Sequence, residues 1–277
     1  MRFLIIPVLL LIAVGLLLVS AYYVPSVGGA LWRAAAPAFV RLAPDAVVRV
    51  PARTDDRFVV LTIDDAPSSR TDEILALLDA HGATATFFIH TDQITEQNAE
   101  AMAAMAASGH DLGHHMPADA AAHRLSAEAF RADFAKAETA LSTIPGRGAE
   151  RYFRPPLARY NARTMAPALR EFGYAEPLAS LGGDKLYVLA GFVPWDAGGA
   201  TNSADPIRNR IVAARYADQL AAGLYPGAIV VFHDGEQGGR APRLDAALFS
   251  LDRFLQAADD QGYAVVSLSD ALARTTQ

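Results

Sequence analysis

The sequence has no cysteine among its 277 residues. Disulfide bonds, thiolate metal sites and cysteine nucleophiles are therefore excluded, and any metal must be bound by His, Asp or Glu. The chain also lacks a dense stripe of Lys and Arg, and its net charge is −6, which argues against nucleic acid as a partner. The length suits one large catalytic domain or two small ones, and hydrophobic residues make up 52% of the chain, enough for a sizeable core.

Charge is also missing from the N-terminus, where no charged residue occurs between Arg2 and Arg33. The strongly apolar part, residues 3–19, is slightly long for the core of a signal peptide and slightly short for an average spanning helix. Residues 19–21 could form a cleavage site, whereas Tyr22 and Tyr23 could lie at the outer membrane interface. We favour a membrane anchor over a cleaved signal peptide in residues 1–24. Either one predicts an exported chain that faces the periplasm or cell exterior, or is secreted if the signal is cleaved.

From Phe58 onwards, short apolar or β-branched segments alternate with amphipathic segments of helical period. The expected strands are 58–64, 84–90, 110–115, 151–156, 185–195, 227–235 and 263–268. The expected helices are 70–82, 95–109, 126–143, 162–173, 205–223 and 243–262. This alternation predicts an α/β fold with a parallel sheet, specifically a distorted (β/α) barrel of about seven or eight strands.

Polar side chains follow several of the expected strands at the point where each strand ends. Because the carboxyl ends of the strands carry the catalytic groups in such barrels, these side chains should meet at one mouth. The residues are Asp64 and Asp65, His115, Arg154, Trp195 and Asp196, and His233 and Asp234. Each alone could be a helix cap or a surface residue, but their recurrence at strand ends predicts one functional site.

A catalytic metal needs about three protein ligands and an open position. Asp65, His115 and Asp119 could supply them, because His115 and Asp119 are four residues apart on a short loop. His110 and His114 have the same spacing, but on a strand they would lie roughly 13 Å apart, too far to share an ion. His114 remains an alternate ligand, and His110 is expected to be structural.

The ordered motifs in this chain resemble those of the NodB-type polysaccharide deacetylases. The motifs are LTIDDAP, GATATFFIH, GHDLGHHMPAD, FRPP and GAIVVFHDG. The resemblance covers about residues 57–270, and we assign residues 57–277 to a NodB-homology domain that follows a connector at 25–56. It implies a metal-dependent hydrolase that removes acetyl groups, N-acetyl foremost, from a carbohydrate polymer of the cell envelope.

The resemblance also implies roles for single residues. Asp64 is similar to the general base and His233 to the general acid, while Arg154 is similar to the arginine that holds the catalytic aspartate. Asp65 and His115 match metal ligands of the family.

Other residues around this site match less directly. Asp196 would orient the acidic histidine, Trp195 would line the acetyl pocket, and Pro156 belongs to the arginine motif as a substrate-orienting residue. The chain departs from the family where Asp119 replaces the usual second histidine ligand and where Ala66 replaces a glycine. The segment RPPLAR, residues 154–159, lacks the aromatic-glycine ending of the family's arginine motif, and WDAG, residues 195–198, reverses the family's usual Asp-Trp order. Substrate contacts are therefore less well defined than the metal centre.

These considerations predict one divalent metal ion, with zinc favoured, an acetylated polysaccharide or oligosaccharide as substrate, and a membrane contact through the N-terminal segment. Two alternatives stay open. The chain could be a catalytically impaired carbohydrate-binding protein on the same scaffold, or a deformylase or other amidohydrolase acting on a lipid-linked sugar. Peptidoglycan, chitin-like oligomers, poly-N-acetylglucosamine and acetylated hemicellulose are all compatible with the sequence.

Overall fold

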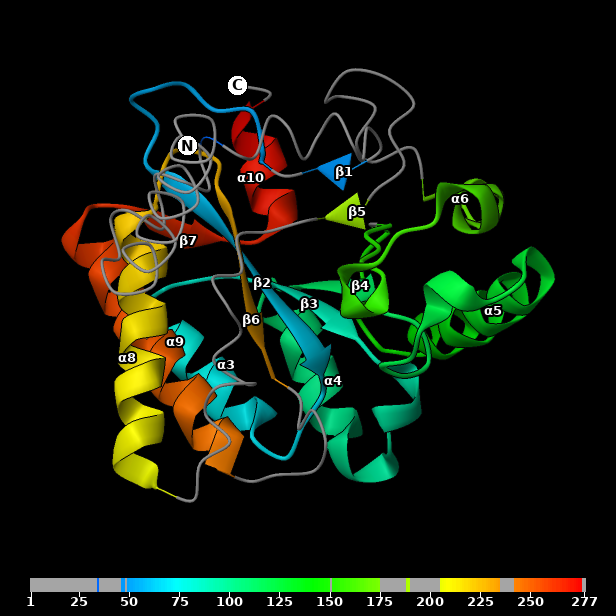
Figure 1. The fold of residues 1–277 in the computed structure, drawn as a ribbon, viewed down its shortest axis with the longest axis horizontal. Helices are drawn as coiled ribbons and strands as arrows, with labels where there is room; N and C mark the ends of the chain where they lie inside the picture. Colours follow the sequence, from blue (N-terminus) through cyan, green and yellow to red (C-terminus); the bar gives the residue numbers. More distant parts are fainter. Residues whose placement is uncertain are drawn as a thin grey trace, which may run out of the picture.

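A parallel β-sheet forms the centre of the protein in a computed structural model (Figure 1). The structure describes residues 49–149, 151–174, 205–234 and 242–275, together with residues 34, 46–47 and 188–189. The expected membrane segment, most of the connector, Trp195 and Asp196 lie outside these residues. Among the residues described, no helix is long and apolar enough to cross a bilayer.

The longest strand, β2, organises the sheet. Its residues Phe58–Ala66 are all buried, as in a parallel strand covered on both faces. The hydrogen-bonded order is β4–β3–β2–β6, and β7 pairs with the first three residues of β2. All pairings in this sheet are parallel. Strand β2 pairs with β3 (Thr86–Ile89), β6 (Ile229–His233) and β7 (Ala264–Val266), and β3 pairs with β4 (Asp111–His114). A separate parallel pair joins β1 (Ala46–Val47) to β5 (Val188–Leu189).

Helices follow most strands and cover the sheet. In Figure 1, α8 and α9 lie side by side with α3 next to them, while α5 and α6 lie at the opposite end of the sheet. Their bounds are α3 Thr71–Ala80, α4 Ala99–Ala107, α5 Ala127–Ser142, α6 Ala162–Glu171, α8 Pro206–Ala222, α9 Pro242–Asp260 and α10 Leu268–Thr275. Short 3-10 helices occur at Thr91–Gln93, Glu96–Asn98, Ala122–Arg124 and Pro156–Ala158.

The apolar core has one large part and two smaller ones. The large part joins β2 and β6 to the helices α3, α8 and α9 through residues such as Leu61, Phe232 and Phe254. A second part contains Phe134 of α5 and Tyr174, which pack together, and Met116 of the segment that follows β4. A third lies under α10. The strand ends that carry the site are therefore anchored in packed side chains.

The parallel α/β class predicted from the sequence is confirmed. The strand pairing among the described residues runs from β4 to β6 without closing, so the barrel itself stays a prediction. The sequence pattern missed α10, which begins directly after β7. It also placed the start of α4 too early, because Thr95 and Asn98 form a capping box that gives Glu96–Asn98 a separate 3-10 turn.

Candidate active site and metal centre

The two adjacent aspartates at the end of β2 face the same site. In a regular strand, neighbouring side chains point to opposite faces of the sheet. Here the pairing with β3 shifts register between Ile63 and Ala66, and Asp65 has a left-handed backbone with φ of 63°. This bulge turns Asp65 toward the side of Asp64, so that His115 Nε2 lies 4.0 Å from Asp64 Oδ2 and 3.4 Å from Asp65 Oδ1.

Backbone strain is concentrated around this site. Besides Asp65, the only non-glycine residues with positive φ in the described part of the chain are Met116 and Leu157. Met116 directly follows His115, and Leu157 lies three residues after Arg154. Left-handed conformations of such residues cost about 1–3 kcal/mol each and persist only where surrounding contacts enforce them.

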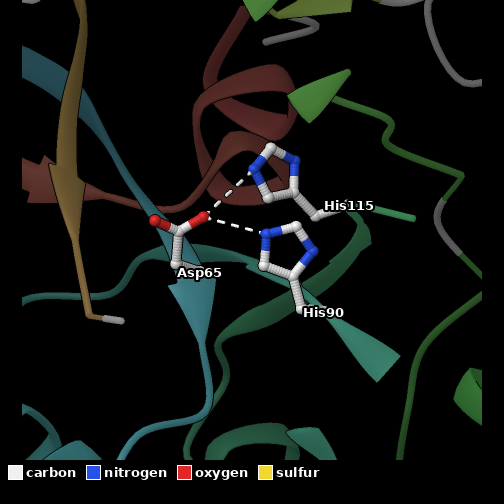
Figure 2. Close-up of side chains that lie close together, drawn as sticks. All are labelled: Asp65, His90 and His115. Atoms are coloured by element: carbon white, nitrogen blue, oxygen red, sulfur yellow. Dashed lines mark hydrogen bonds and ion pairs between the residues drawn. The ribbon is translucent and has the colours of Figure 1, made fainter. Parts of the chain in front are cut away.

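Two histidines converge on Asp65 (Figure 2). His90 follows β3 and places Nε2 3.0 Å from Asp65 Oδ1, while His115 follows β4. The two imidazole rings stack with centroids 4.4 Å apart. All three side chains are buried, and one ligand atom from each lies within 4.8 Å of the others.

The charges in this cluster depend strongly on one another. Burial alone would raise the pKa of Asp65, but its hydrogen bonds with His115 and His90 outweigh burial and hold that pKa far below its usual range. Burial likewise opposes the charge on His115, yet the hydrogen bond to Asp65 and the charges of Asp64 and Asp65 raise its pKa overall. Asp65 is therefore ionised and ready to accept a cation.

Arg154 holds Asp64 in place. The segment carrying Arg154 continues the sheet beyond β4 through a bridge between His114 and Phe153. The buried Arg154 Nη1 donates hydrogen bonds to Asp64 Oδ1 and, at 2.9 Å, to Thr62 Oγ1. Its guanidinium also lies 4.5 Å from the centroid of the Phe88 ring. These contacts fix the carboxylate in one orientation.

His233 lies next to Asp64 across the sheet. The two are register partners in the parallel pairing of β2 with β6, and His233 is half-buried. Its neighbour Asp234 is fully buried and ties β6 to the loop after β2. Asp234 accepts hydrogen bonds from Ser68 Oγ at 2.5 Å and Thr71 Oγ1 at 2.6 Å, and its own N–H donates to Asp64 O at 2.8 Å.

Asp119 lies on the exposed loop that follows β4 and outside the group of close ligand atoms. Partial desolvation, followed by the charge of Asp65, raises its pKa, and the charges of His90, His115 and His233 act on it as well. The carboxyl group therefore belongs to the rim of the same site, and its role as a metal ligand stays a prediction.

The other two histidines of this region make structural contacts. His114 stacks on Phe134 with centroids 3.9 Å apart, its Nε2 donates to Phe134 O, and its Nδ1 accepts from Met116 N. Neither ring nitrogen is left for a metal. His110 Nδ1 accepts a hydrogen bond from Ala85 N, as expected for a structural residue.

The structure thus brings Asp64, Asp65, His115, Arg154 and His233 to one region at the carboxyl ends of the strands. Trp195 and Asp196 lie outside the described residues. Pro156 is buried at the start of the 3-10 helix that follows Arg154, and its orienting role stays a prediction.

Sequence reasoning missed His90. The signal was present, because His90 directly follows an apolar β-rich segment, as the other site residues do. A single histidine at a strand end carries no spacing pattern, however, and only the packing of β3 against β2 places it beside Asp65.

The residues present fit a divalent metal. Two imidazoles and one carboxylate are a donor set typical of catalytic zinc sites. Oxygen and nitrogen donors of this kind also suit other divalent metals, so the cluster supports a metal site without selecting zinc.

The family model for polysaccharide deacetylase matches residues 52–177. A curated chitin deacetylase from Pestalotiopsis sp is 32% identical over 135 residues, which are 45% of this chain and 42% of that protein. The chain therefore spans less than half the length of this relative.

Solved structures share the fold. A peptidoglycan N-acetylglucosamine deacetylase superposes with a TM-score of 0.66 at 19% identity, covering 85% of this chain and 96% of the other. A CE4 family pseudoenzyme from Bacillus anthracis superposes with a TM-score of 0.59 at 18% identity, covering 82% and 68%. The family-model match supports the resemblance seen in the motifs, and it includes Asp64, Asp65, His115 and Arg154.

Proposed function

We propose that this protein is a metal-dependent hydrolase that removes acetyl groups, N-acetyl foremost, from a carbohydrate polymer. One observation carries the proposal. Asp64 is held by the buried Arg154, is in register with His233, and lies beside the buried cluster of Asp65 with its histidines. A protein that only binds a glycan has no need for two groups suited to proton transfer beside a metal-binding cluster.

Asp64 is suited to act as the general base. Its carboxylate would accept the proton of the water that attacks the acetyl carbonyl, while Arg154 keeps the accepting oxygen in a fixed orientation. His233, half-buried on the neighbouring strand, would donate a proton to the departing amine nitrogen. The base and the acid therefore come from adjacent parallel strands.

A divalent metal, with zinc favoured, would be held with Asp65 and His115 among its ligands. When bound, it would supply Lewis-acid stabilisation of the negative charge that develops on the acyl oxygen.

The relatives support a substrate that carries N-acetyl groups. One matched protein is named a chitin deacetylase and one superposed structure a peptidoglycan N-acetylglucosamine deacetylase. We infer an acetylated polysaccharide or oligosaccharide for this chain too, without assigning the polymer.

A carbohydrate-binding protein without catalysis is the second candidate. The departures at Asp119 and Ala66 favour it, and the superposed pseudoenzyme shows that the fold occurs in pseudoenzymes as well as enzymes. This candidate requires glycan binding without acetate release.

Metal analysis combined with an acetate-release screen separates the two candidates. Purified protein would be assayed for bound metal and then incubated with chitin oligomers, peptidoglycan fragments, poly-N-acetylglucosamine and acetylated xylan. The proposed enzyme releases acetate from at least one glycan, and chelation of its metal abolishes release. Binding with no acetate release from a metal-loaded protein would support the second candidate.

We also infer that the protein is exported and contacts the membrane through residues 1–24. The uncharged run that follows Arg2 supports this inference. Cell fractionation with N-terminal sequencing would test it, since an intact N-terminus in the membrane fraction indicates an anchor and a new N-terminus near Ala21 indicates cleavage.

A further inference from the structure

We propose that His90 is the third protein ligand of the metal and takes the place that Asp119 was expected to fill. The site would then have two histidines and one aspartate, with the second histidine supplied by β3 instead of the loop after β4. This inference rests on the proposed metal dependence. It assigns a role to His90, which is not among the residues that match metal ligands of the family.

Hydrogen bonds to the backbone set the orientation of both imidazoles. Nδ1 of His115 lies 2.6 Å from Arg154 O, and Nδ1 of His90 lies 3.4 Å from Met116 O. A carbonyl oxygen only accepts, so each Nδ1 carries the proton. Ligand histidines commonly have their other ring nitrogen held in this way.

This arrangement aims two Nε2 atoms at one carboxylate oxygen. His90 Nε2 lies 3.0 Å and His115 Nε2 3.4 Å from Asp65 Oδ1, all in a buried environment. The two rings stack with centroids 4.4 Å apart, so both Nε2 atoms approach Asp65 from the same direction. One divalent cation bound by all three side chains would satisfy both Nε2 atoms and this carboxylate oxygen together.

The spacing of the donor atoms agrees with a shared ion. Two ligands bound at about 2.0–2.1 Å in a tetrahedral zinc site lie about 3.3 Å from each other. The two distances to Asp65 Oδ1 are close to this value.

The backbone fixes His90 at this position. His90 N donates to Ala66 O at 2.9 Å, which joins the end of β3 to the bulge in β2 that carries Asp65. The His90 side chain is fully buried, whereas Asp119 is exposed. His90 is therefore already in place, whereas Asp119 lies outside the group of close ligand atoms.

Counting the bound histidines tests the inference on the unmodified protein. The full chain would be loaded with Co²⁺ alone, and the paramagnetically shifted imidazole N–H signals would be counted by proton NMR. Each histidine bound through Nε2 retains an N–H at Nδ1, so two shifted signals are expected. One signal would overturn the assignment of His90 and favour Asp119, leaving the proposed metal dependence intact.

Failure of the wild-type protein to bind Co²⁺ or Zn²⁺ would overturn both the inference and the metal dependence. If ions bind, affinities of variants give a second readout. We expect His90→Asn and His115→Asn each to weaken Zn²⁺ binding at least about 100-fold. A residue that only hydrogen-bonds to a metal ligand would weaken it by about 10- to 100-fold when replaced. Asp119→Asn should change affinity by less than about tenfold and keep two shifted signals.

His81→Asn is the matched control for replacing a histidine. His81 lies at the end of α3, where Nδ1 is 2.7 Å from Asp259 Oδ2, away from the cluster. Its affinity for Zn²⁺ should equal that of the wild type. An affinity of His90→Asn equal to that of His81→Asn, with a large loss in Asp119→Asn, would overturn the proposal.

Discussion

At the scale of single residues, Asp64 and Asp65 show how position separates two identical side chains. Asp65 faces two imidazoles and is held ionised by them, whereas Asp64 faces the guanidinium of Arg154. The bulge in β2 is what allows adjacent residues to do this on one side of the sheet. We therefore expect their substitutions to have different effects.

Replacing Asp64 by Asn should leave the metal bound and reduce kcat by about 10²- to 10⁴-fold, because an amide cannot accept the proton. Metal content by elemental analysis and acetate release under saturating substrate would measure the two effects. Asp55→Asn, in the exposed turn before β2, is the matched control and should keep full activity. Wild-type turnover by the Asp64→Asn protein would show that the base is another group.

At the scale of secondary-structure elements, β4 separates two adjacent histidines. His114 points toward α5 and stacks on Phe134, while His115 points toward Asp65. Side chains that alternate along an extended segment give adjacent residues these opposite directions. Close packing of β4 against β3 keeps His115 in position, and Gly113 makes that packing possible.

We expect Gly113→Ala to destabilise the protein by about 1–3 kcal/mol, as overpacked core substitutions do. The added Cβ would lie 2.8 Å from two ring carbons of Phe88 and 3.1 Å from Tyr152 O. Urea unfolding would measure the loss. Phe88→Leu removes the ring atoms, so Gly113→Ala should cost less in that background. An equal cost in both backgrounds would mean that Phe88 is not the obstacle.

At the scale of the whole molecule, buried neutral histidines make stability depend on pH. Burial lowers the pKa of His110 to about 4 and that of His114 to about 3. Between these values and the unfolded value of about 6.5, the unfolded chain binds more protons than the folded one. The free energy of unfolding should therefore fall as pH drops below about 6.5.

One such histidine should account for about 2 kcal/mol of lost stability between pH 7 and pH 5. His114→Gln should lower stability at both pH values, because two hydrogen bonds change, but it should reduce the difference between them. Urea unfolding at pH 7 and pH 5 would measure this difference. A difference as large as that of the wild type would assign the acid sensitivity to other groups.

Metal removal should also act on the whole fold, because the cluster joins the ends of β2, β3 and β4. A ligand present at 100 times its Kd stabilises the folded state by about 2.7 kcal/mol. For a chain of this size that corresponds to a decrease in Tm of about 5–11 °C on chelation. Differential scanning calorimetry with and without EDTA, followed by zinc addition, would show the decrease and its reversal. An unchanged Tm in a protein shown to bind zinc would contradict this coupling.

The sequence by itself determined the parallel α/β class, the positions of most helices and strands, and the strand ends at which Asp64, Asp65, His115, Arg154 and His233 occur. These features are local, since they follow from hydrophobic period and from which residue comes after each strand. Only the tertiary structure decided that Asp65 turns to the side of Asp64 and that His90 lies within hydrogen-bonding distance of Asp65. It also decided that both ring nitrogens of His114 form hydrogen bonds with backbone groups. Those outcomes depend on the register and packing of strands that are distant in sequence, which periodicity along one strand does not specify.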